Sequence, residues 1–365
     1  MKVNILSVYI DDVPISPNQI LELHLISSLD SLLYRCIMKI RDTSGVIESL
    51  IKFGTICTIN YTDVDTKNIV LSCPLQILSF QKTATASVTL IDEFQITLIS
   101  PYYFSQTPKR KAYYGSVSNI IQEVSAREPF FTKKSIEPSS DTPSLRYQLL
   151  ISDYDFMSQI ARYAVRDASA MFLYSTIERE LILKSLTTII NIPATYTLIP
   201  LLDSKNEVTA SLPNTLGMLA VAFYADGKQT NSTRSYLFNI AHTPADQIDT
   251  VKSSMALKTL QETEAKLVKF KSGASASIVR WDMPPHDAVS RFINYSARVD
   301  QELFSAIAIV PPLAGTGITL GSTFKIYMND DRCPENGTYY VSYIDHQANE
   351  GILYSKLHLI RIAQQ

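Results

Sequence analysis

Hydrophobic residues in the first hundred positions fall into short runs rich in Val, Ile, Thr, Tyr and Leu, separated by Asp-Asp, Pro and Asp-Thr-Ser-Gly segments. Such runs are typical of β-strands, and the separating segments favour turns. Apolar and polar residues alternate in Leu21–Leu25 and Tyr34–Ile40, so one face of each strand is expected to meet a core. Strands are predicted at Val3–Ile10, Ile20–Ile26, Tyr34–Ile40, Thr55–Tyr61, Ile69–Phe80 and Ala86–Leu98. This spacing indicates a closed or nearly closed antiparallel barrel over 1–100.

The pattern changes after Pro101, where helical spacing appears. The segment Gly115–Arg127 has apolar residues at positions i, i+3, i+4 and i+7, which is one helical stripe (Val117, Ile120, Ile121 and Val124). A second helix is predicted to begin at Ser152, with Asp155 three residues on as a capping partner. Strand-like runs follow at Ala170–Tyr174 and Leu181–Leu186. We therefore expect a small α+β domain over 101–200.

Strand-like patterning returns at Met218–Tyr224 and again at the end of the chain, in Thr323–Met328, Thr338–Ile344 and Ile352–Ile362. Between them lie a long polar stretch and a helical pattern at Ala288–Phe304. We interpret 201–230 and 304–365 as a second barrel, split by an inserted domain with a helix at 231–303. The predicted fold class is β-dominated α+β, with two similar antiparallel tube-type barrels and two smaller α/β or helical domains.

The two β regions resemble each other in sequence. An apolar residue, a glycine, a hydroxyl residue and a strand ending in Ile occur at 53–59 and again at 320–326, and a strand, a polar hairpin and an alternating strand follow in each. The positions that match are Gly54 with Gly321, Ile59 with Ile326, Phe80 with Ile344 and Leu90 with Leu359. Either two unrelated meanders look alike at this level, or a barrel has been duplicated. In the second case three chains would place six similar barrels around one axis, a pseudo-sixfold ring from a threefold assembly.

The composition narrows the classes of function. The chain has 365 residues, 46% of them apolar, and a formal net charge of −2. The apolar content is sufficient for hydrophobic cores. The near-neutral charge argues against a protein that binds nucleic acid electrostatically. Only 11 glycines occur, and no phosphate-binding glycine loop is found. No apolar run reaches the roughly 18 residues of a membrane span, and the N-terminus does not resemble a signal peptide.

Residues that could carry chemistry do not form a recognised constellation. The four cysteines lack CxxC spacing and are expected to be buried thiols in a reducing compartment, and the five histidines lack HExxH or HxH spacing. The segment 329–331 is expected to be a polar turn, the basic run 109–111 a solvated turn, and Ser49 with Lys52 a chance match to a penicillin-binding motif. Two possible acid pairs, Asp42 with Glu48 and Glu262 with Glu264, are interpreted as solvated charges. No catalytic, cofactor or metal residue is predicted.

Four segments, in this order and spacing, resemble the baseplate hub proteins of contractile phage tails and the related hub part of type VI secretion spike proteins. They are Ser28–Asp63, Tyr114–Ile121, Ser152–Phe156 with the strand at 170–172, and the C-terminal stretch Leu320–Leu359. The segment 226–283 matches no pattern of that family.

The resemblance implies a structural protein of the virion, assembled in the host cytoplasm. As a homotrimer it would form a pseudo-sixfold ring that joins the sixfold tail tube, or a tube-initiator ring, to the threefold central spike. Tape measure and surrounding baseplate proteins would be further partners, and DNA would pass through the channel without specific binding. The likeness stops before any fused spike or lysozyme module, which are expected to be separate proteins. Two alternatives stay open: a cell-wall-degrading tail-tip enzyme that uses an acid pair, and a carbohydrate-binding β module.

Overall fold

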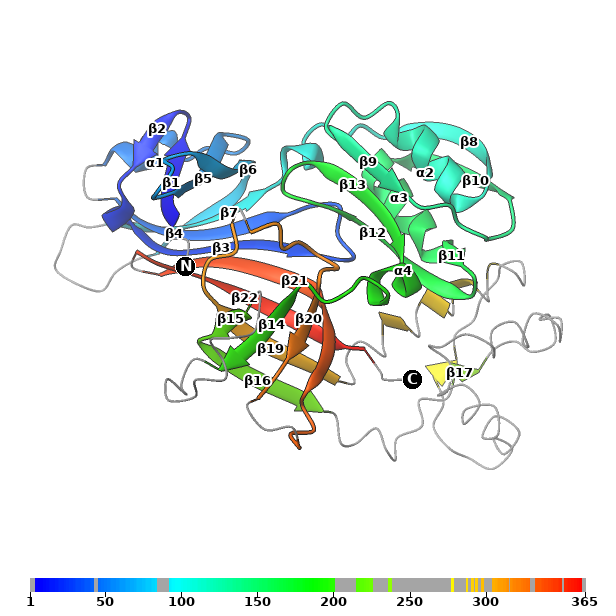
Figure 1. Cartoon of the computed structure of the whole chain (residues 1–365). Helices are drawn as coiled ribbons and strands as arrows, with labels where there is room; N and C mark the ends of the chain where they lie inside the picture. The colour runs from blue at the N-terminus through cyan, green and yellow to red at the C-terminus, as the bar shows by residue number, and fades with distance from the viewer. Residues whose placement is uncertain are drawn as a thin grey trace.

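The computed structural model describes residues 4–42, 45–83, 92–200, 215–225, 236–237, 277–278, 287, 290–291, 293–294, 297–298, 304–314, 316–328, 332–349 and 351–362. The fold is a β-dominated α+β arrangement of curled, half-barrel sheets with few helices (Figure 1). Fourteen strands form one continuous sheet that curls twice. The predicted fold class is thus confirmed at this coarse level.

The first curled sheet contains the predicted N-terminal strands. Its order is β3-β4-β7-β6-β5-β1-β2, and every neighbouring pair is antiparallel. Helix α1 (Val46–Leu50) lies between β4 and β5 in the chain. The bounds are β1 (Asn4–Ile10), β2 (Val13–Ile15), β3 (Ile20–Ser28), β4 (Arg35–Asp42), β5 (Ile56–Asp63), β6 (Ile69–Thr83) and β7 (Asp92–Ile99).

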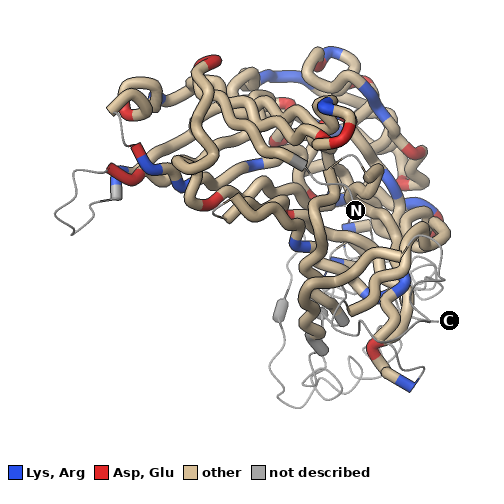
Figure 2. The backbone as a smooth tube through the Cα atoms, turned by 60° about the vertical axis from the view of Figure 1, so that its left-hand side comes forward, with Lys and Arg blue, Asp and Glu red and all other residues tan. Residues whose placement is uncertain are grey.

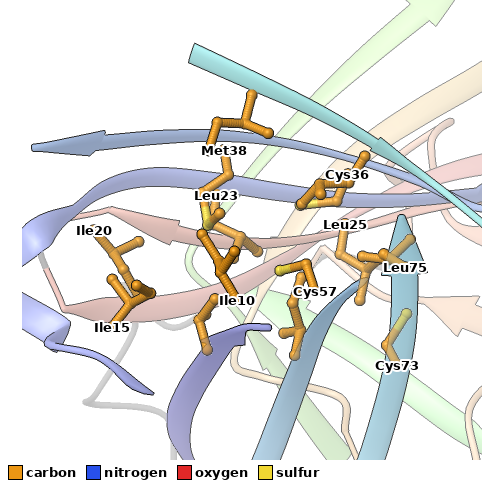
Figure 3. Packing of buried hydrophobic residues seen from close by; sticks show 14 of the residues in the cluster. Ile10, Ile15, Ile20, Leu23, Leu25, Cys36, Met38, Cys57, Cys73 and Leu75 are labelled. Carbon is orange, nitrogen blue, oxygen red and sulfur yellow. The ribbon is translucent and has the colours of Figure 1, made fainter. Parts of the chain in front are cut away.

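Alternation along these strands builds the first core. In β4, Cys36, Met38 and Ile40 are fully buried, while the residues between them are only partly covered. Figure 3 shows Cys36 and Met38 beside Leu25 and Leu23, their partners on β3, with Cys57 of β5 in the same cluster. Each large apolar side chain buried in this way contributes about 1.5–3 kcal/mol.

The second curled sheet is built from strands that lie far apart in the sequence. Its core is formed by buried residues such as Phe324, Leu357 and Leu359. Strand β14 pairs in parallel with β20 and with β15 of this sheet. The bounds are β14 (Tyr196–Pro200), β15 (Thr215–Met218), β16 (Ala220–Ala225), β19 (Phe304–Val310), β20 (Thr323–Ile326), β21 (Gly337–Asn349) and β22 (Ile352–Arg361).

The α+β region forms the third core, drawn in cyan and green in Figure 1. Its predicted helices are present: the stripe of α2 is buried, and the side chain of Ser152 caps α3 by accepting from the Asp155 N–H. The basic run 109–111 belongs to a strand, β8, rather than to a turn. The bounds are η2 (Pro101–Tyr103), β8 (Lys109–Gly115), α2 (Val117–Ser125), β9 (Lys133–Ile136), β10 (Ser144–Ile151), α3 (Asp153–Ile160), η3 (Ala161–Tyr163), β11 (Val165–Arg166), β12 (Ser169–Ser175), β13 (Glu180–Ser185) and α4 (Leu186–Ile190).

The inserted segment is described only in part. Two short strands, β17 (Tyr236–Leu237) and β18 (Ser277–Ile278), pair in parallel. The described residues between 287 and 298 are helical, whereas Phe304, predicted to end that helix, opens strand β19. This helix contacts the α+β region through Arg146, which donates to Asp287 at 2.5 and 2.8 Å. No helix in the described ranges is long and apolar enough to cross a membrane.

Candidate assembly surface

Five consecutive strands of each curled sheet follow the same path. In the first they are β3, β4, β5, β6 and β7, paired in the spatial order β3-β4-β7-β6-β5. In the second they are β16, β19, β20, β21 and β22, paired in the order β16-β19-β22-β21-β20. Every pair in both sets is antiparallel. We call these sets the first repeat and the second repeat.

Two glycines occupy the same corner of the two repeats. Gly54 has φ +82° and Gly321 has φ +77°, values that favour glycine because it has no Cβ. The N–H of each donates to the strand opposite, Gly54 to the Ile77 carbonyl and Gly321 to the Val341 carbonyl, both at 2.8 Å. In return, the Ile77 N–H donates to the carbonyl of Thr55, the residue after Gly54, at 3.0 Å. The Val341 N–H likewise donates to the carbonyl of Ser322, the residue after Gly321, at 2.9 Å.

A β-bulge follows at the same place in both repeats. The pairing of β6 with β7 shifts between Ile77 and Ser79, and the pairing of β21 with β22 shifts between Val341 and Tyr343. Ile77 faces Leu98, as Val341 faces Leu359. A bulge bends a strand and increases its twist, so the two repeats share a local distortion as well as an order.

The positions that were matched in the sequence can now be placed. Ile59 and Ile326 are both buried, at the ends of their apolar segments in β5 and β20. Phe80 and Ile344 both stand three residues beyond the shared Ile77 and Val341 positions. Leu90 lies outside the described residues. The described residue at the position of Leu359 is Leu98, because the bulge fixes the alignment of the closing strand.

The two repeats are joined inside the chain by a seam between β3 and β21. Residues Glu22–Ser28 pair with Tyr343–Asn349 in antiparallel register. Strand β20 pairs only with Gly337–Tyr340, so the later half of β21 is left to receive β3. The result is one run of eight strands, β6-β7-β4-β3-β21-β22-β19-β16, which we call the shared sheet.

A polar network holds the seam on the face turned away from the two cores. His24 Nδ1 lies 3.0 Å from Asp345 Oδ2, and its Nε2 lies 2.8 Å from Glu22 Oε1. Burial of the imidazole ring alone would lower the pKa of His24, but the hydrogen bonds to Glu22 and Asp345 outweigh it and raise that pKa. Gln347 donates to the same Asp345 oxygen. The seam is therefore tighter when His24 carries a proton.

Several bases on this same face, which we call the open face, stand next to an acid. Lys39 Nζ lies 3.0 Å from one Glu93 oxygen and Arg41 Nη2 lies 3.1 Å from the other. The hydrogen bond from Lys39, helped by Arg41, lowers the pKa of Glu93. An acid faces a base across three strand pairs: Glu22 and Lys39, Arg41 and Glu93, and Asp345 and Lys356. Figure 2 shows that both signs of charge are interspersed along the chain.

The candidate acids do not meet in a site. Asp42 is buried, not solvated as expected, because it accepts from the N–H groups of Gly45 at 2.8 Å and Glu48 at 2.9 Å at the start of α1. Glu48 extends to solvent and lies 3.4 Å from Lys82 Nζ. Glu262 and Glu264, like the segment 329–331, fall outside the described residues.

One acid pair escaped the sequence analysis. Glu128 and Asp153 share a hydrogen bond, with Lys109 Nζ 2.5 Å from Asp153 and 3.5 Å from Glu128. Burial raises the pKa of Glu128; for Asp153, hydrogen bonds outweigh burial and lower the pKa. The Lys109 ammonium group interacts with both carboxyl groups. We interpret the trio as a structural ion cluster.

A further set of groups with shifted pKa values lies buried within the cores. Burial lowers the pKa of His346 to about 4, and it raises the pKa of the three buried thiols, for Cys57 to about 12. Cys333 differs from the expectation, since it is only partly buried and its Sγ donates to Glu335. Among the residues that the structure describes, no group of three or more His, Cys, Asp or Glu could hold a metal ion. His242 and His286 are not among them.

A cavity of about 260 Å³ lies where the two curled sheets and the α+β region meet. Its walls include Leu71, Ile344 and His346 on the sheets and Ile177 and Glu178 from the loop after β12. Glu178 is its one carboxylate, so the cavity holds no acid pair.

No protein-family model matches the sequence, and no curated protein is matched. Solved structures do match over almost the whole chain. A 43 kDa tail protein of prophage MuSo2 from Shewanella oneidensis has 10% identity and a TM-score of 0.63, covering 98% of both chains. A tail protein from Neisseria meningitidis has 10% identity and a TM-score of 0.59, covering 98% of this chain and 96% of that one.

A third match is a component of the type VI secretion system of E. coli, described by its structural similarity to bacteriophage tail proteins. It has 10% identity and a TM-score of 0.52, covering 98% of this chain and 77% of that chain. The chain therefore has the fold of phage tail proteins, and the resemblance found in the sequence is confirmed at the level of the fold.

Proposed function

We propose that this protein is a structural hub of a phage tail baseplate. Three chains form a ring of six similar repeats, which joins the sixfold tail tube, or a tube-initiator ring, to the threefold central spike. The protein works in the virion through shape and interfaces. The likeness to tail proteins supports the tail and its baseplate as the place of this role.

The observation that carries the proposal is the repeated strand order within one continuous sheet. A ring made of three chains has sixfold features only if each chain supplies two equivalent units related by a similar step. The two repeats have the same strand order, the same glycine corner and the same bulge. The seam between β3 and β21 supplies one such step.

The pairing of bases with acids on the open face suits the wall of a channel for DNA. A cationic wall would bind phosphates and hold the passing strand, with an affinity that grows with each neutralised charge. On the open face Lys39, Arg41 and Lys356 each stand next to an acid, which weakens their attraction for phosphate. The rims of the ring would contact the tube on one side and the spike on the other. Tape measure and surrounding baseplate proteins are further proposed partners.

Mass measurement and image averaging of the purified protein test this proposal. We expect particles of three chains, and averaged electron micrographs of a ring with a central hole and threefold and near-sixfold features. A chain that stays monomeric at tens of micromolar, or a particle without a hole, would refute it. Peptidoglycan turnover by the purified monomer would favour the enzymatic alternative.

A further inference from the structure

One edge of each repeat lacks a partner strand within the described part of the chain. Strand β16 pairs with β19 on one side, and no described strand lies on its other side. In β6, the segment Ser79–Thr83 pairs with β7, while β5 pairs only as far as Gln76. Exposed edges of this kind attract further strands.

The seam shows what such edges bind. Through the shared bulge and strand order, β16 occupies in the second repeat the place that β3 occupies in the first. In the same way, Ser79–Thr83 of β6 occupies the place of Tyr343–Gln347 of β21. The seam between β3 and β21 is thus an internal example of contact between the two free edges.

We propose that β16 of one chain pairs antiparallel with Ser79–Thr83 of β6 in a second copy of this chain. This inference rests on the proposed function and names the contact that closes the ring. Transferring the register of the seam gives four pairs of residues. They are Phe80 with Ala225, Gln81 with Tyr224, Lys82 with Phe223, and Thr83 with Ala222.

Burial at the equivalent positions supports a missing neighbour on both edges. Phe80 is 49% exposed, whereas its equivalent Ile344, beside β3, is 4% exposed. On the other edge Leu23 is fully buried in the seam, whereas its equivalent Val221 is only partly buried. An added strand would cover the apolar surface that each free edge leaves open.

The two edges differ from each other, so the contact is head-to-tail. Such a contact closes into a ring when the rotation per step divides a full turn, and otherwise it forms open fibres. With two repeats per chain and a similar step at each seam, closure at six repeats requires three chains. The partner is therefore the same edge pair on a neighbouring chain.

Disulfide cross-linking tests the register. The variant Thr83→Cys with Ala222→Cys carries cysteines at paired positions, and Cys333→Ser removes the one partly exposed native thiol. Directly opposed Cα atoms lie about 4.5–5.5 Å apart, within the reach of a disulfide. In the control Thr83→Cys with Ala220→Cys, the offset of two residues adds about 7 Å along the strand and places the pair out of reach.

We expect the paired variant to give covalent dimers and trimers on non-reducing gels, with nothing larger than three chains, and at least fivefold more product than the control. Each single-cysteine variant alone should give none, and a mixture of the two should give dimers. This last result distinguishes a head-to-tail contact from a symmetric one. Gel filtration of the reduced variants checks that they fold and assemble as the parent does.

The two proposals can fail separately. Particles of three chains in which the paired variant cross-links no better than the control would overturn the strand pairing and leave the hub assembly standing. Covalent products that continue beyond three chains would overturn ring closure. The absence of any three-chain particle would overturn the proposed function and this inference together.

Discussion

The corner glycines allow a quantitative test of the internal repeat. Both Gly54 and Gly321 have positive φ, at +82° and +77°. A left-handed backbone costs a residue with a Cβ about 1–2 kcal/mol. Alanine also lowers the conformational entropy of the unfolded chain, which stabilises the folded protein by about 0.4–1 kcal/mol. We therefore expect Gly54→Ala and Gly321→Ala each to lower the free energy of unfolding by about 1 kcal/mol.

Valine should separate the two corners, because their surroundings differ. A Cβ at Gly54 would meet nothing within 4 Å. A Cβ at Gly321 would lie 3.4 Å from Tyr174 Oη and 3.7 Å from Ile189 Cγ1, so the further methyl groups of valine must displace them. Crowding of this kind costs about 1–3 kcal/mol. The loss of stability caused by Gly321→Val should therefore exceed the loss caused by Gly54→Val by about 1–3 kcal/mol.

Urea unfolding followed by circular dichroism measures these differences in the free energy of unfolding. The variants are compared with one common m-value, the slope of that free energy against urea concentration. Gly54→Asn is the matched control, since asparagine tolerates the left-handed region better than alanine and should recover part of the loss. A neutral Gly54→Ala would refute the backbone argument. Equal losses for the two valine variants would refute the argument from their surroundings.

Three further predictions concern buried polar groups, each checked by urea unfolding. The folded-state pKa of His346, about 4, lies below its unfolded value of about 6.5, so the unfolded chain binds the proton first. Between pH 7.5 and pH 4, the free energy of unfolding of the wild type should fall by about 3 kcal/mol relative to that of His346→Gln. A difference between the two proteins that does not change with pH would contradict this. The pKa of His24 is raised in the folded protein, so the protonated ring stabilises the fold fully below about pH 6.5, and this stabilisation is lost as the pH rises through the folded-state pKa. Relative to His24→Gln, the free energy of unfolding of the wild type should therefore rise on acidification from pH 8 to 6. The opposite trend would refute the seam network. Asp42→Ala should cost about 1–2 kcal/mol through loss of the bonds from Gly45 and Glu48, and an unchanged midpoint would show that α1 does not depend on this cap.

Local patterns predicted the elements whose environment is set by neighbours in the sequence. The alternation over Tyr34–Ile40 predicted β4, and the stripe over Gly115–Arg127 predicted α2, because one face of each meets a core. The cap at Ser152 was predictable for the same reason, since donor and acceptor are three residues apart.

Contacts between distant segments could not be predicted in this way. The basic run of β8 looks like a turn because Arg110 and Lys111 are exposed to solvent, where Lys111 lies 2.9 Å from Glu123 of α2. Strand β14 carries no sign that its partners are β15 and β20. The match of the corner glycines could be predicted from the sequence. The last strands of the two repeats, β7 and β22, could be aligned only through the shared bulge, which matches Leu98 with Leu359.

The seam also affects how the chain is made. At the contact of His24 with Asp345, its two strands are separated by 321 positions in the sequence. A ribosome that adds about 5–20 residues per second would therefore complete β21 roughly 15–60 s after β3. During this interval the edge of β3 is open to strands of other nascent chains, and charged residues such as Glu22 and His24 make such pairing less favourable. Biosynthesis of this protein thus depends on keeping an early strand unpaired until the last part of the polypeptide arrives.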